Sequence, residues 1–277
     1  MSIHSVKQSF QLDGQVAVVT GGAGLLGTKH CETIAEMGGI PWVIDVDESR
    51  AKAVAEYIQN NFQVEAFWKV TDITDPAEVI DLKETILKQC GRLDILINNA
   101  ANNPKVEDNT SSWTRFENFP LKVWMEDIAV GLTGSFLCSQ TLGHYMSENG
   151  GGVILNIASD LGVIAPDQRI YKNEGENSET QSVKPVTYSV VKSGLIGLTR
   201  YLSTYWAEKG VRANALAPGG VEAGQDEAFK KRLENLIPMA RMAHQDEYKS
   251  AVAFLVSDAS SYMNGSVISI DGGRTAW

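Results

Sequence analysis

The sequence has few of the residues that form disulfides or bind metal ions. Its 277 residues include three cysteines, Cys31, Cys90 and Cys138, which lie far apart and form no C-x-x-C pair. The four histidines show no H-x-x-x-H or similar ligand spacing. These absences exclude a disulfide framework and a zinc knuckle, and they leave no set of ligands with the spacing of a transition-metal site. We therefore expect reduced, packed thiols and no metal.

Positive charge and long apolar runs are also scarce. Lys and Arg total 24 against 34 Asp and Glu, a formal net charge of −10. Such a molecule repels phosphate backbones and anionic lipid, so nucleic acid and membrane surfaces are poor partners. No apolar stretch approaches the roughly 20 residues that cross a bilayer, and no charged head precedes an apolar run at the N-terminus. Because 43% of the residues are hydrophobic, we expect a globular, cytoplasmic protein with a sizeable core.

Apolar, β-branched runs alternate with amphipathic stretches along the chain. The expected strands are 16–20, 41–46, 64–70, 93–98, 153–158, 211–217 and 267–270, and the expected helices are 25–37, 48–59, 75–89, 123–146 and 187–209. This order predicts right-handed crossovers and a parallel sheet that is covered by helices on both faces. No linker, repeat or composition shift divides the chain. We therefore expect one doubly wound α/β domain over residues 1–277.

A glycine-rich segment, Thr20-Gly21-Gly22-Ala23-Gly24-Leu25-Leu26-Gly27, joins the first expected strand to the first expected helix. Glycines permit a tight turn there and let a pyrophosphate approach the N–H groups at the positive end of the helix dipole. The segment predicts a dinucleotide-binding loop that uses Gly21, Gly24, Leu25, Leu26 and Gly27. An ordinary glycine-rich turn is the alternative.

Asp45 ends the second expected strand, where a carboxylate accepts hydrogen bonds from the ribose hydroxyls of adenosine. The same carboxylate repels a 2′-phosphate. No Arg or Lys lies in the glycine loop or directly after Asp45; Lys29 is inside the helix and Arg50 is further on. We therefore expect NAD as the cofactor. The alternative is that Asp45 is only a solvated residue at a strand end.

Tyr188 and Lys192 lie four residues apart on the expected helix 187–209, so their side chains share one helix face. A tyrosine with a pKa of about 10 shuttles protons near neutrality only if that pKa falls by roughly three units. A cation ~4 Å away contributes about that much, so we expect Lys192 to lower the pKa of Tyr188. Tyr205 and Lys209 repeat the spacing, but they lie roughly 25 Å further along the helix and are expected to pack.

Further motifs follow in order, and together they resemble those of the short-chain dehydrogenase/reductase family over nearly the whole chain. Val70-Thr71-Asp72-Ile73 resembles the segment that contacts adenine, and Asn98-Asn99-Ala100-Ala101 resembles the motif of the fourth strand. Pro218-Gly219-Gly220-Val221 resembles the turn that holds the nicotinamide. The resemblance implies that the cofactor is bound by the glycine loop together with Asp45, Asp72, Ile73, Asn99, Ala100, Tyr188, Lys192, Pro218, Gly219 and Val221.

The resemblance also implies a Rossmann-like fold, a homo-oligomer that is usually a tetramer, and an NAD-dependent oxidoreductase. The expected reaction interconverts a secondary alcohol and a ketone on a polar, sugar-like small molecule. Tyr188 is expected to move the hydroxyl proton, Lys192 to hold the nicotinamide ribose and Ser159 to position the substrate oxygen. For Ser159, capping of a turn is the alternative. Two other functions stay open: an NAD-retaining sugar-nucleotide epimerase or dehydratase, and a catalytically weak NAD-binding protein.

Four features depart from the family pattern. The glycine spacing matches the longer, sugar-nucleotide branch, whereas the rest of the chain resembles the shorter branch. Gly131 stands where an asparagine usually completes a catalytic tetrad, and Ala223 where a threonine often lies near the nicotinamide amide. The fourth departure is length, because 28 residues separate Ser159 from Tyr188, more than the shorter branch usually has.

The extra length predicts an inserted active-site loop over residues 160–186, which we expect to lie over the substrate and to close as a lid. Residues 222–243 are a second candidate lid. Three cations of the loop are candidates for binding a phosphate or carboxylate: Arg169, Lys172 and Lys184. A solvated surface loop is the alternative, because acidic residues outnumber them: Asp167, Glu174, Glu176 and Glu179.

Overall fold

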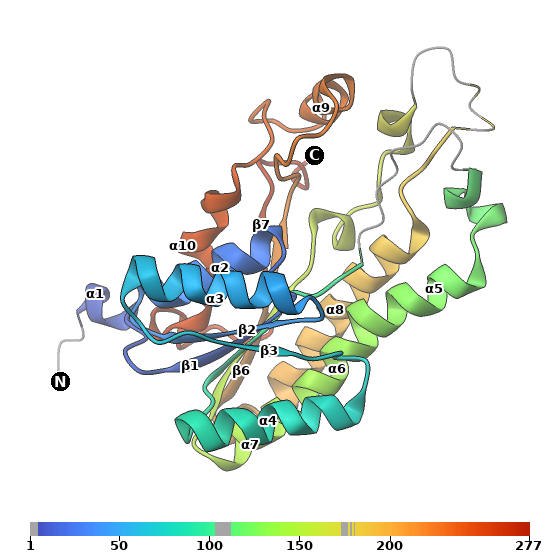
Figure 1. The fold of residues 1–277 in the computed structure, drawn as a ribbon. Coiled ribbons are helices and arrows are strands. Elements are labelled where there is room, and N and C mark those ends of the chain that lie inside the picture. The colour runs from blue at the N-terminus through green and yellow to red at the C-terminus, as the bar shows by residue number, and fades with distance from the viewer. Residues whose placement is uncertain (1–4, 103–111, 173–176, 178, 180) are drawn as a thin grey trace.

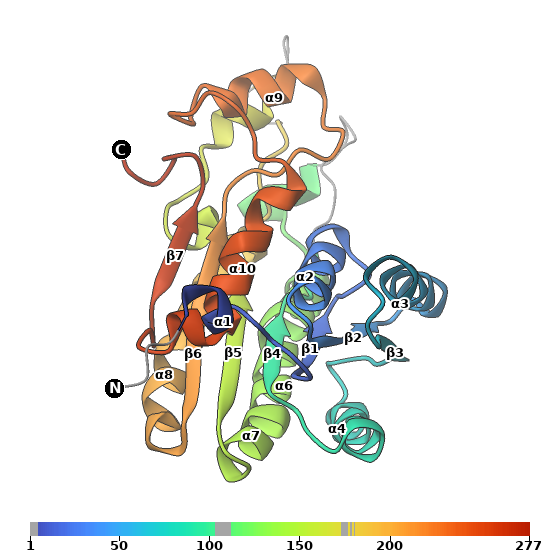
Figure 2. The same ribbon diagram turned by 90° about the vertical axis from the view of Figure 1, so that its left-hand side faces the viewer.

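The computed structural model describes residues 5–102, 112–172, 177, 179 and 181–277. In this part of the chain, seven strands form one parallel sheet in the order β3-β2-β1-β4-β5-β6-β7 (Figures 1 and 2). The strands are β1 (Val16–Thr20), β2 (Ile40–Asp45), β3 (Phe67–Val70), β4 (Ile95–Asn98), β5 (Gly152–Ile157), β6 (Val211–Pro218) and β7 (Val267–Ile270). The predicted doubly wound α/β fold is confirmed.

Helices cover both faces of the sheet. The described helices are α1 (Val6–Ser9), α2 (Leu25–Glu36), α3 (Glu48–Phe62), α4 (Pro76–Cys90), α5 (Leu121–Ile128), α6 (Gly134–Cys138), α7 (His144–Glu148), α8 (Val186–Tyr205), α9 (Glu227–Glu234) and α10 (Lys249–Val256). One buried cluster joins the sheet to α2, α3 and α10, and a second joins it to α4, α6, α7 and α8. The sheet is therefore buried between two helical layers.

Strand β1 shows why the strands read as continuous apolar runs. Ala17 and Val19 belong to the first cluster, while Val16 and Val18 belong to the second. Because successive side chains of a strand point to opposite faces, a sheet buried on both faces needs apolar residues at every position.

Several element boundaries differ from the sequence prediction, and one predicted helix is interrupted. Strand β3 begins at Phe67 rather than at residue 64, and α8 ends at Tyr205 rather than at residue 209. The predicted helix 123–146 is a helical stretch, α5 to α7, that is interrupted by two π-helical turns, η3 (Ala129–Thr133) and η4 (Ser139–Gly143). Gly131 lies in the first of these turns, a type of irregularity that is frequent at functional sites.

The strand order reverses between β1 and β4, which creates a crevice at the carboxyl ends of these two strands. The Asn99 side chain, just after β4, bridges this point. Its Nδ2 donates to the carbonyl oxygens of Thr20 and Gly21, each at 3.0 Å. The start of the glycine loop is thereby held against the end of β4, at the edge where a doubly wound sheet binds its ligand.

Candidate active site

The glycine loop packs too closely for larger residues. Gly21 has φ +59°, and a Cβ there would lie 2.9 Å from the Cα of Ala100. A Cβ on Gly27 would lie 2.1 Å from the carbonyl oxygen of Gly21. Helix α2 begins at Leu25, so the N–H groups of its first turn have no acceptor within the helix. This tight loop with free N–H groups at a helix N-terminus fits the pyrophosphate of a dinucleotide.

Asp45 and Arg50 both reach the glycine loop. The Asp45 carboxylate accepts hydrogen bonds from the N–H groups of Ala23, at 3.1 Å, and Asp47, at 3.2 Å. The Arg50 guanidinium donates to the carbonyl oxygen of Ala23 at 2.5 Å. The sequence noted Arg50 only as lying further along the chain than Asp45, and the structure brings it to the loop because the first turn of α3 faces the loop. A carboxylate and a cation therefore stand together where the ribose of adenosine is expected.

The predicted adenine segment lies after β3. Asp72 is exposed, and its carboxylate accepts hydrogen bonds from the N–H and the hydroxyl of Thr74, at 2.9 and 2.7 Å. Ile73 is buried against Gly134, where an added Cβ would lie 2.6 Å from its Cδ1 atom. Asp72 thus forms a local turn and keeps oxygen lone pairs that face solvent.

The predicted nicotinamide turn leaves the end of β6. The N–H of Gly219 donates to the carbonyl oxygen of Ile270 at 2.9 Å, and a Cβ on Gly219 would lie 2.7 Å from the Cα of Asp271. Val221 forms an isolated parallel bridge with Ala243. The turn is therefore fixed by β7 and by the segment that follows α9, at the same edge of the sheet as the glycine loop.

Ser159 lies just after β5 and is part of a buried polar chain. Its hydroxyl donates to Oδ1 of Asp160 at 2.7 Å, and Oδ2 of Asp160 accepts from Arg274 at 2.7 Å. The Ser159 oxygen also caps the short helix η5 (Asp160–Gly162) by accepting from the N–H of Leu161 at 3.2 Å. The capping role considered for Ser159 therefore exists, and it fixes the hydroxyl rather than removing it from the site.

Tyr188 and Lys192 lie at the start of α8, beside Ser159. The Lys192 ammonium donates to the carbonyl oxygen of Ile157 at 2.7 Å and lies 5.8 Å from the centroid of the Tyr188 ring. Burial lowers the pKa of Lys192 to about 8, and the positive charge of Lys184 adds to this effect. Lys192 is thus held between the end of β5 and the tyrosine.

The pKa of Tyr188 departs from the sequence prediction. The side chain is half-buried, but its hydroxyl is desolvated, and this raises its pKa above the ordinary value. The Asp160 carboxylate also raises the pKa, while the Ser159 hydroxyl lowers it. The expectation of a lowered pKa is wrong for the chain alone, because desolvation of the hydroxyl is the largest effect and it raises the pKa.

The second Tyr–Lys pair lies at the other end of α8. Tyr205 is exposed, and its ring stacks on that of Tyr201 with 5.5 Å between the centroids. Lys209 lies beyond the helix and forms an ion pair with Glu148. These contacts agree with the predicted packing role.

Gly131 is in contact with α8. A Cβ on Gly131 would lie 2.5 Å from Cγ1 of the buried Val191. Beside it, the buried Asp127 carboxylate accepts a hydrogen bond of 2.5 Å from the hydroxyl of Thr187. Val191 thus fills the space in which the side chain of an asparagine would begin, and Asp127 is a polar group of this helix that faces α8.

The two candidate lids pack on each other. Within the inserted loop, η6 (Gln168–Tyr171) contributes Ile170 to an apolar cluster with residues of the segment 222–243: Leu233, Ile237 and Met242. The Arg232 guanidinium donates to the carbonyl oxygen of Ile170 at 2.6 Å. Both ribbon views show η6 and α9 side by side beyond the carboxyl ends of the strands. The sequence predicted the two segments as candidate lids, and their described parts pack against each other.

Part of the inserted loop lies outside the described residues, namely 173–176, 178 and 180. These include Glu174 and Glu176.

Two charged residues at this edge, Asp160 and Arg274, were not predicted from the sequence. Asp160 directly follows Ser159 in an apolar stretch, which is a signal of a buried charge that needs a partner. Arg274 gives no such signal, because 114 residues separate it from Asp160 along the chain. Their pairing depends on how the C-terminal segment leaves β7.

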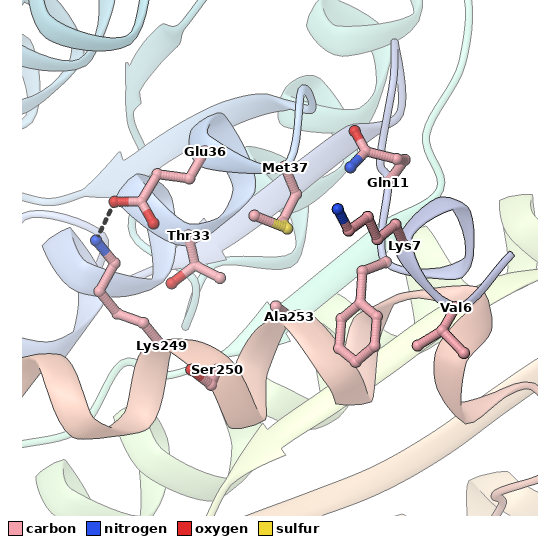
Figure 3. Close-up of a pocket in the computed structure, with 10 residues that line it drawn as sticks. Val6, Lys7, Gln11, Thr33, Glu36, Met37, Lys249, Ser250 and Ala253 are labelled. Atoms are coloured by element: carbon pink, nitrogen blue, oxygen red, sulfur yellow. Dashed lines mark hydrogen bonds and ion pairs between the residues drawn. The ribbon is translucent and has the colours of Figure 1, made fainter.

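A pocket of about 420 Å³ lies between α1, α2 and α10, and Figure 3 shows the residues that line it. Thr33 belongs to α2, and Met37 directly follows that helix. Lys249 of α10 forms an ion pair with Glu36 across the pocket. The predicted catalytic and cofactor-binding residues are not among its lining residues. We therefore place the candidate site at the sheet edge and not here.

The described residues contain no group of three or more His, Cys, Asp or Glu side chains that is arranged to hold a metal ion. None of the helices in the described ranges has the length and apolar character needed to cross a membrane.

Comparison with known proteins connects this geometry to a family. A family described as "short chain dehydrogenase" matches residues 15–172, and one described as "Enoyl-(Acyl carrier protein) reductase" matches residues 176–275. The chain is 32% identical to D-threitol dehydrogenase of Mycolicibacterium smegmatis, covering 98% of this chain and 96% of the relative. It is 33% identical to galactitol 2-dehydrogenase of Rhizobium johnstonii, covering 99% and 100%.

A solved structure is similar along its whole length. It is a gluconate 5-dehydrogenase from Burkholderia cenocepacia in complex with NADP and tartrate, with a TM-score of 0.85, 28% identity and coverage of 99% of this chain and 100% of that chain. The fold, the order of the motifs and these matches agree. The chain belongs to the short-chain dehydrogenase/reductase family, and it is an oxidoreductase of alcohols and ketones.

Proposed function

We propose that the chain is an NAD-dependent oxidoreductase that interconverts a secondary alcohol and a ketone on a polyol or sugar-like small molecule. The observation that carries the proposal is the convergence of Ser159, Tyr188 and Lys192 at the sheet edge that also holds the glycine loop. The threitol and galactitol dehydrogenases among the relatives support the substrate class.

Each of the three side chains has a role that follows from its contacts. Ser159 donates to Asp160 in the chain alone, and when substrate binds we propose that this hydroxyl donates instead to the substrate oxygen and holds it beside the phenol. Tyr188 takes that hydroxyl proton during oxidation and returns it during reduction. Lys192 is held by the Ile157 carbonyl near the Tyr188 ring, where its ammonium is placed to hold the nicotinamide ribose. When bound, the nicotinamide accepts or gives the hydride.

Proton transfer by Tyr188 is assisted by positive charge. Desolvation raises the pKa of Tyr188 in the chain alone, which disfavours the phenolate. A cationic ring bound beside the phenol acts in the opposite direction, since an opposite charge nearby favours the ionised form. We therefore propose that the tyrosine becomes a competent base only when the oxidised cofactor is in place.

NAD is the proposed cofactor because the Asp45 carboxylate stands at the end of β2 beside the glycine loop. Arg50 is the opposing feature, since its guanidinium reaches the same loop and the similar gluconate 5-dehydrogenase structure holds NADP. We give Asp45 the greater weight because a carboxylate at this place repels a 2′-phosphate directly. The Arg50 guanidinium is already bonded to the Ala23 carbonyl.

A panel of polyols, sugars, sugar acids, sugar phosphates and nucleotide sugars tests the proposal. We expect one class to reduce NAD to NADH with net turnover, and NADP to support a lower rate. Turnover of a nucleotide sugar without net NADH would instead indicate an epimerase or dehydratase. Tight NAD binding with no reaction of any compound would contradict the proposal and favour a binding protein.

The homo-oligomer also remains a proposal, and it rests on the family resemblance. Light scattering coupled to size-exclusion chromatography measures it, and a tetramer is the expected result.

A further inference from the structure

Lys184 differs from the other cations of the inserted loop. The sequence left Arg169, Lys172 and Lys184 as candidates for an anionic group. The guanidinium of Arg169 is 87% exposed and pairs with Asp167 at 2.5 Å, so it points to solvent. The Lys184 ammonium instead lies 3.9 Å from the centroid of the Tyr188 ring. The structure thereby brings one loop cation to the side chain that moves the proton.

The backbone around Lys184 is held from two sides. The N–H of Lys184 donates to the side-chain oxygen of Gln168 at 2.8 Å, and the buried Gln181 side chain donates to the Gln168 carbonyl at 2.9 Å. The N–H of Val183 donates to the hydroxyl of Thr114 at 3.1 Å. These bonds to Gln168 and Thr114 fix the backbone of Lys184 before any substrate binds. Less conformational entropy is then lost when the substrate binds.

The charges around Tyr188 favour an anion. Asp160, the carboxylate that acts on Lys184, is already neutralised by Arg274. Lys184 and Lys192 are close enough that the charge of one lowers the pKa of the other. Burial lowers the pKa of Lys184 to about 8, so the side chain remains mostly protonated at neutral pH. Two ammonium groups thus lie near one tyrosine ring, 3.9 and 5.8 Å from its centroid, in a protein whose net charge is −10.

We propose that Lys184 binds an oxyanion of the substrate, a carboxylate or a phosphate, a few bonds from the carbon that is oxidised. The substrate is then an acidic polyol, either a sugar acid or a sugar phosphate, rather than a neutral one. This inference rests on the proposed function and specifies its substrate class. A hydrogen bond to a charged partner of this kind contributes about tenfold to a hundredfold in affinity.

A second role for Lys184 is separable from this one. If Lys184 acted only by stabilising the Tyr188 phenolate, its removal would slow neutral and acidic substrates by the same factor. If it binds the substrate anion, its removal weakens the acidic compound selectively and leaves a neutral analogue nearly unchanged.

Calorimetric titration of the NAD-bound protein tests the binding directly. Tartrate and threitol each have four carbons and two secondary hydroxyls. Tartrate ends in two carboxylates, whereas threitol ends in two hydroxymethyl groups. We expect the wild type to bind tartrate, or inorganic phosphate if the site prefers phosphate, at least about tenfold more tightly than threitol. Lys184→Met should abolish this advantage. Lys184→Arg should retain most of it, and Arg169→Gln, the matched control on the same loop, should retain all of it.

Equal affinities for the anions and threitol would overturn the inference, as would an advantage that survives in Lys184→Met. Failure of the wild type to bind either tartrate or phosphate at millimolar concentration would overturn it too. Binding of tartrate but not phosphate indicates a carboxylate subsite, and binding of phosphate but not tartrate indicates a phosphate subsite. Either result supports the inference.

Turnover separates this inference from the proposed function. Glucitol, gluconate and glucitol 6-phosphate share a similar chain of secondary hydroxyls. Glucitol is neutral, gluconate carries a carboxylate and glucitol 6-phosphate carries a phosphate. Oxidation of neutral polyols with no preference for the acidic ones would overturn the inference and leave the proposed function standing. Absence of NAD or NADP reduction by any alcohol in the wider panel would overturn the proposed function itself.

Discussion

The Arg274 guanidinium donates to the Asp160 carboxylate at 2.7 Å, and both side chains are less than 10% exposed. The other carboxylate oxygen of Asp160 accepts a hydrogen bond from the Ser159 hydroxyl. The last residues of the chain are thereby connected to the predicted catalytic serine through one buried ion pair.

Breaking this ion pair from one side should destabilise the protein strongly. Arg274→Met leaves an uncompensated buried carboxylate and is expected to cost about 3–5 kcal/mol in the free energy of unfolding, measured with urea. Adding Asp160→Asn should recover part of this loss, because the neutral amide needs no counter-ion. Lys52→Met, which removes an exposed pair with Glu56, is the control and should change stability by less than about 0.5 kcal/mol. An Arg274→Met variant as stable as the wild type would show that the pair contributes nothing.

Cofactor preference should depend on Asp45 and Arg50 in opposite ways. Asp45→Ala removes the acceptor for the ribose hydroxyls and the repulsion of a 2′-phosphate, so the NADPH/NADH affinity ratio should rise by about tenfold to a hundredfold. In Asp45→Ala/Arg50→Ala the ratio should rise less than in Asp45→Ala, because the double variant also lacks the cation that stands beside Asp45. Fluorescence titration with NADH and NADPH measures both without a substrate. An unchanged ratio in Asp45→Ala argues against the assignment of Asp45.

The two helical glycines Gly131 and Gly197 should respond oppositely to alanine. A Cβ on Gly197 meets open space, so Gly197→Ala should stabilise the protein by roughly 0.5–1 kcal/mol through helix propensity. A Cβ on Gly131 would lie 2.5 Å from Val191, and Gly131→Ala should cost about 1–3 kcal/mol from overpacking. Val191→Ala in the same chain should relieve that cost. Equal stabilisation by both single substitutions in urea unfolding would mean that Val191 moves aside freely.

His30 should make the fold sensitive to acid. The ring is fully buried in α2, and burial lowers its pKa to about 4, with Asn99 acting in the opposite direction. Because the folded pKa lies below the unfolded value of about 6.5, the unfolded chain binds more protons between these two values. Stability therefore falls as the pH falls through this window, by about 2 kcal/mol at pH 5.

Urea unfolding at pH 5 and pH 7.5 measures this effect. The loss on acidification should be about 2 kcal/mol smaller in His30→Gln than in the wild type, since the variant has no imidazole to titrate. Equal losses in the two proteins would exclude His30 as the source.

Most of the fold was predictable because its signals are local. The run Val16–Thr20, the glycines after it and the apolar spacing from Leu25 onward specify a strand, a turn and a helix within a short segment. The sequence also predicts that Ser159 and Tyr188 lie at one edge of the sheet, since the carboxyl ends of parallel strands meet at that edge.

The features that were missed or misplaced depend on contacts between distant parts of the chain. Arg50 reaches Ala23 only because of the angle at which α3 packs, and Arg274 reaches Asp160 only after β7 has joined the sheet. The direction of the pKa shift of Tyr188 was wrong for a similar reason, because spacing gives its distance from Lys192 but not its desolvation.

The central claim, that the Tyr188 hydroxyl moves the substrate proton, is tested most directly by Tyr188→Phe. This change removes one oxygen and keeps the ring. We predict that kcat for NAD reduction by the identified substrate falls by about 10²–10⁴-fold, while the NADH affinity changes by only a few-fold. Turnover by Tyr188→Phe at a rate close to that of the wild type would contradict the account.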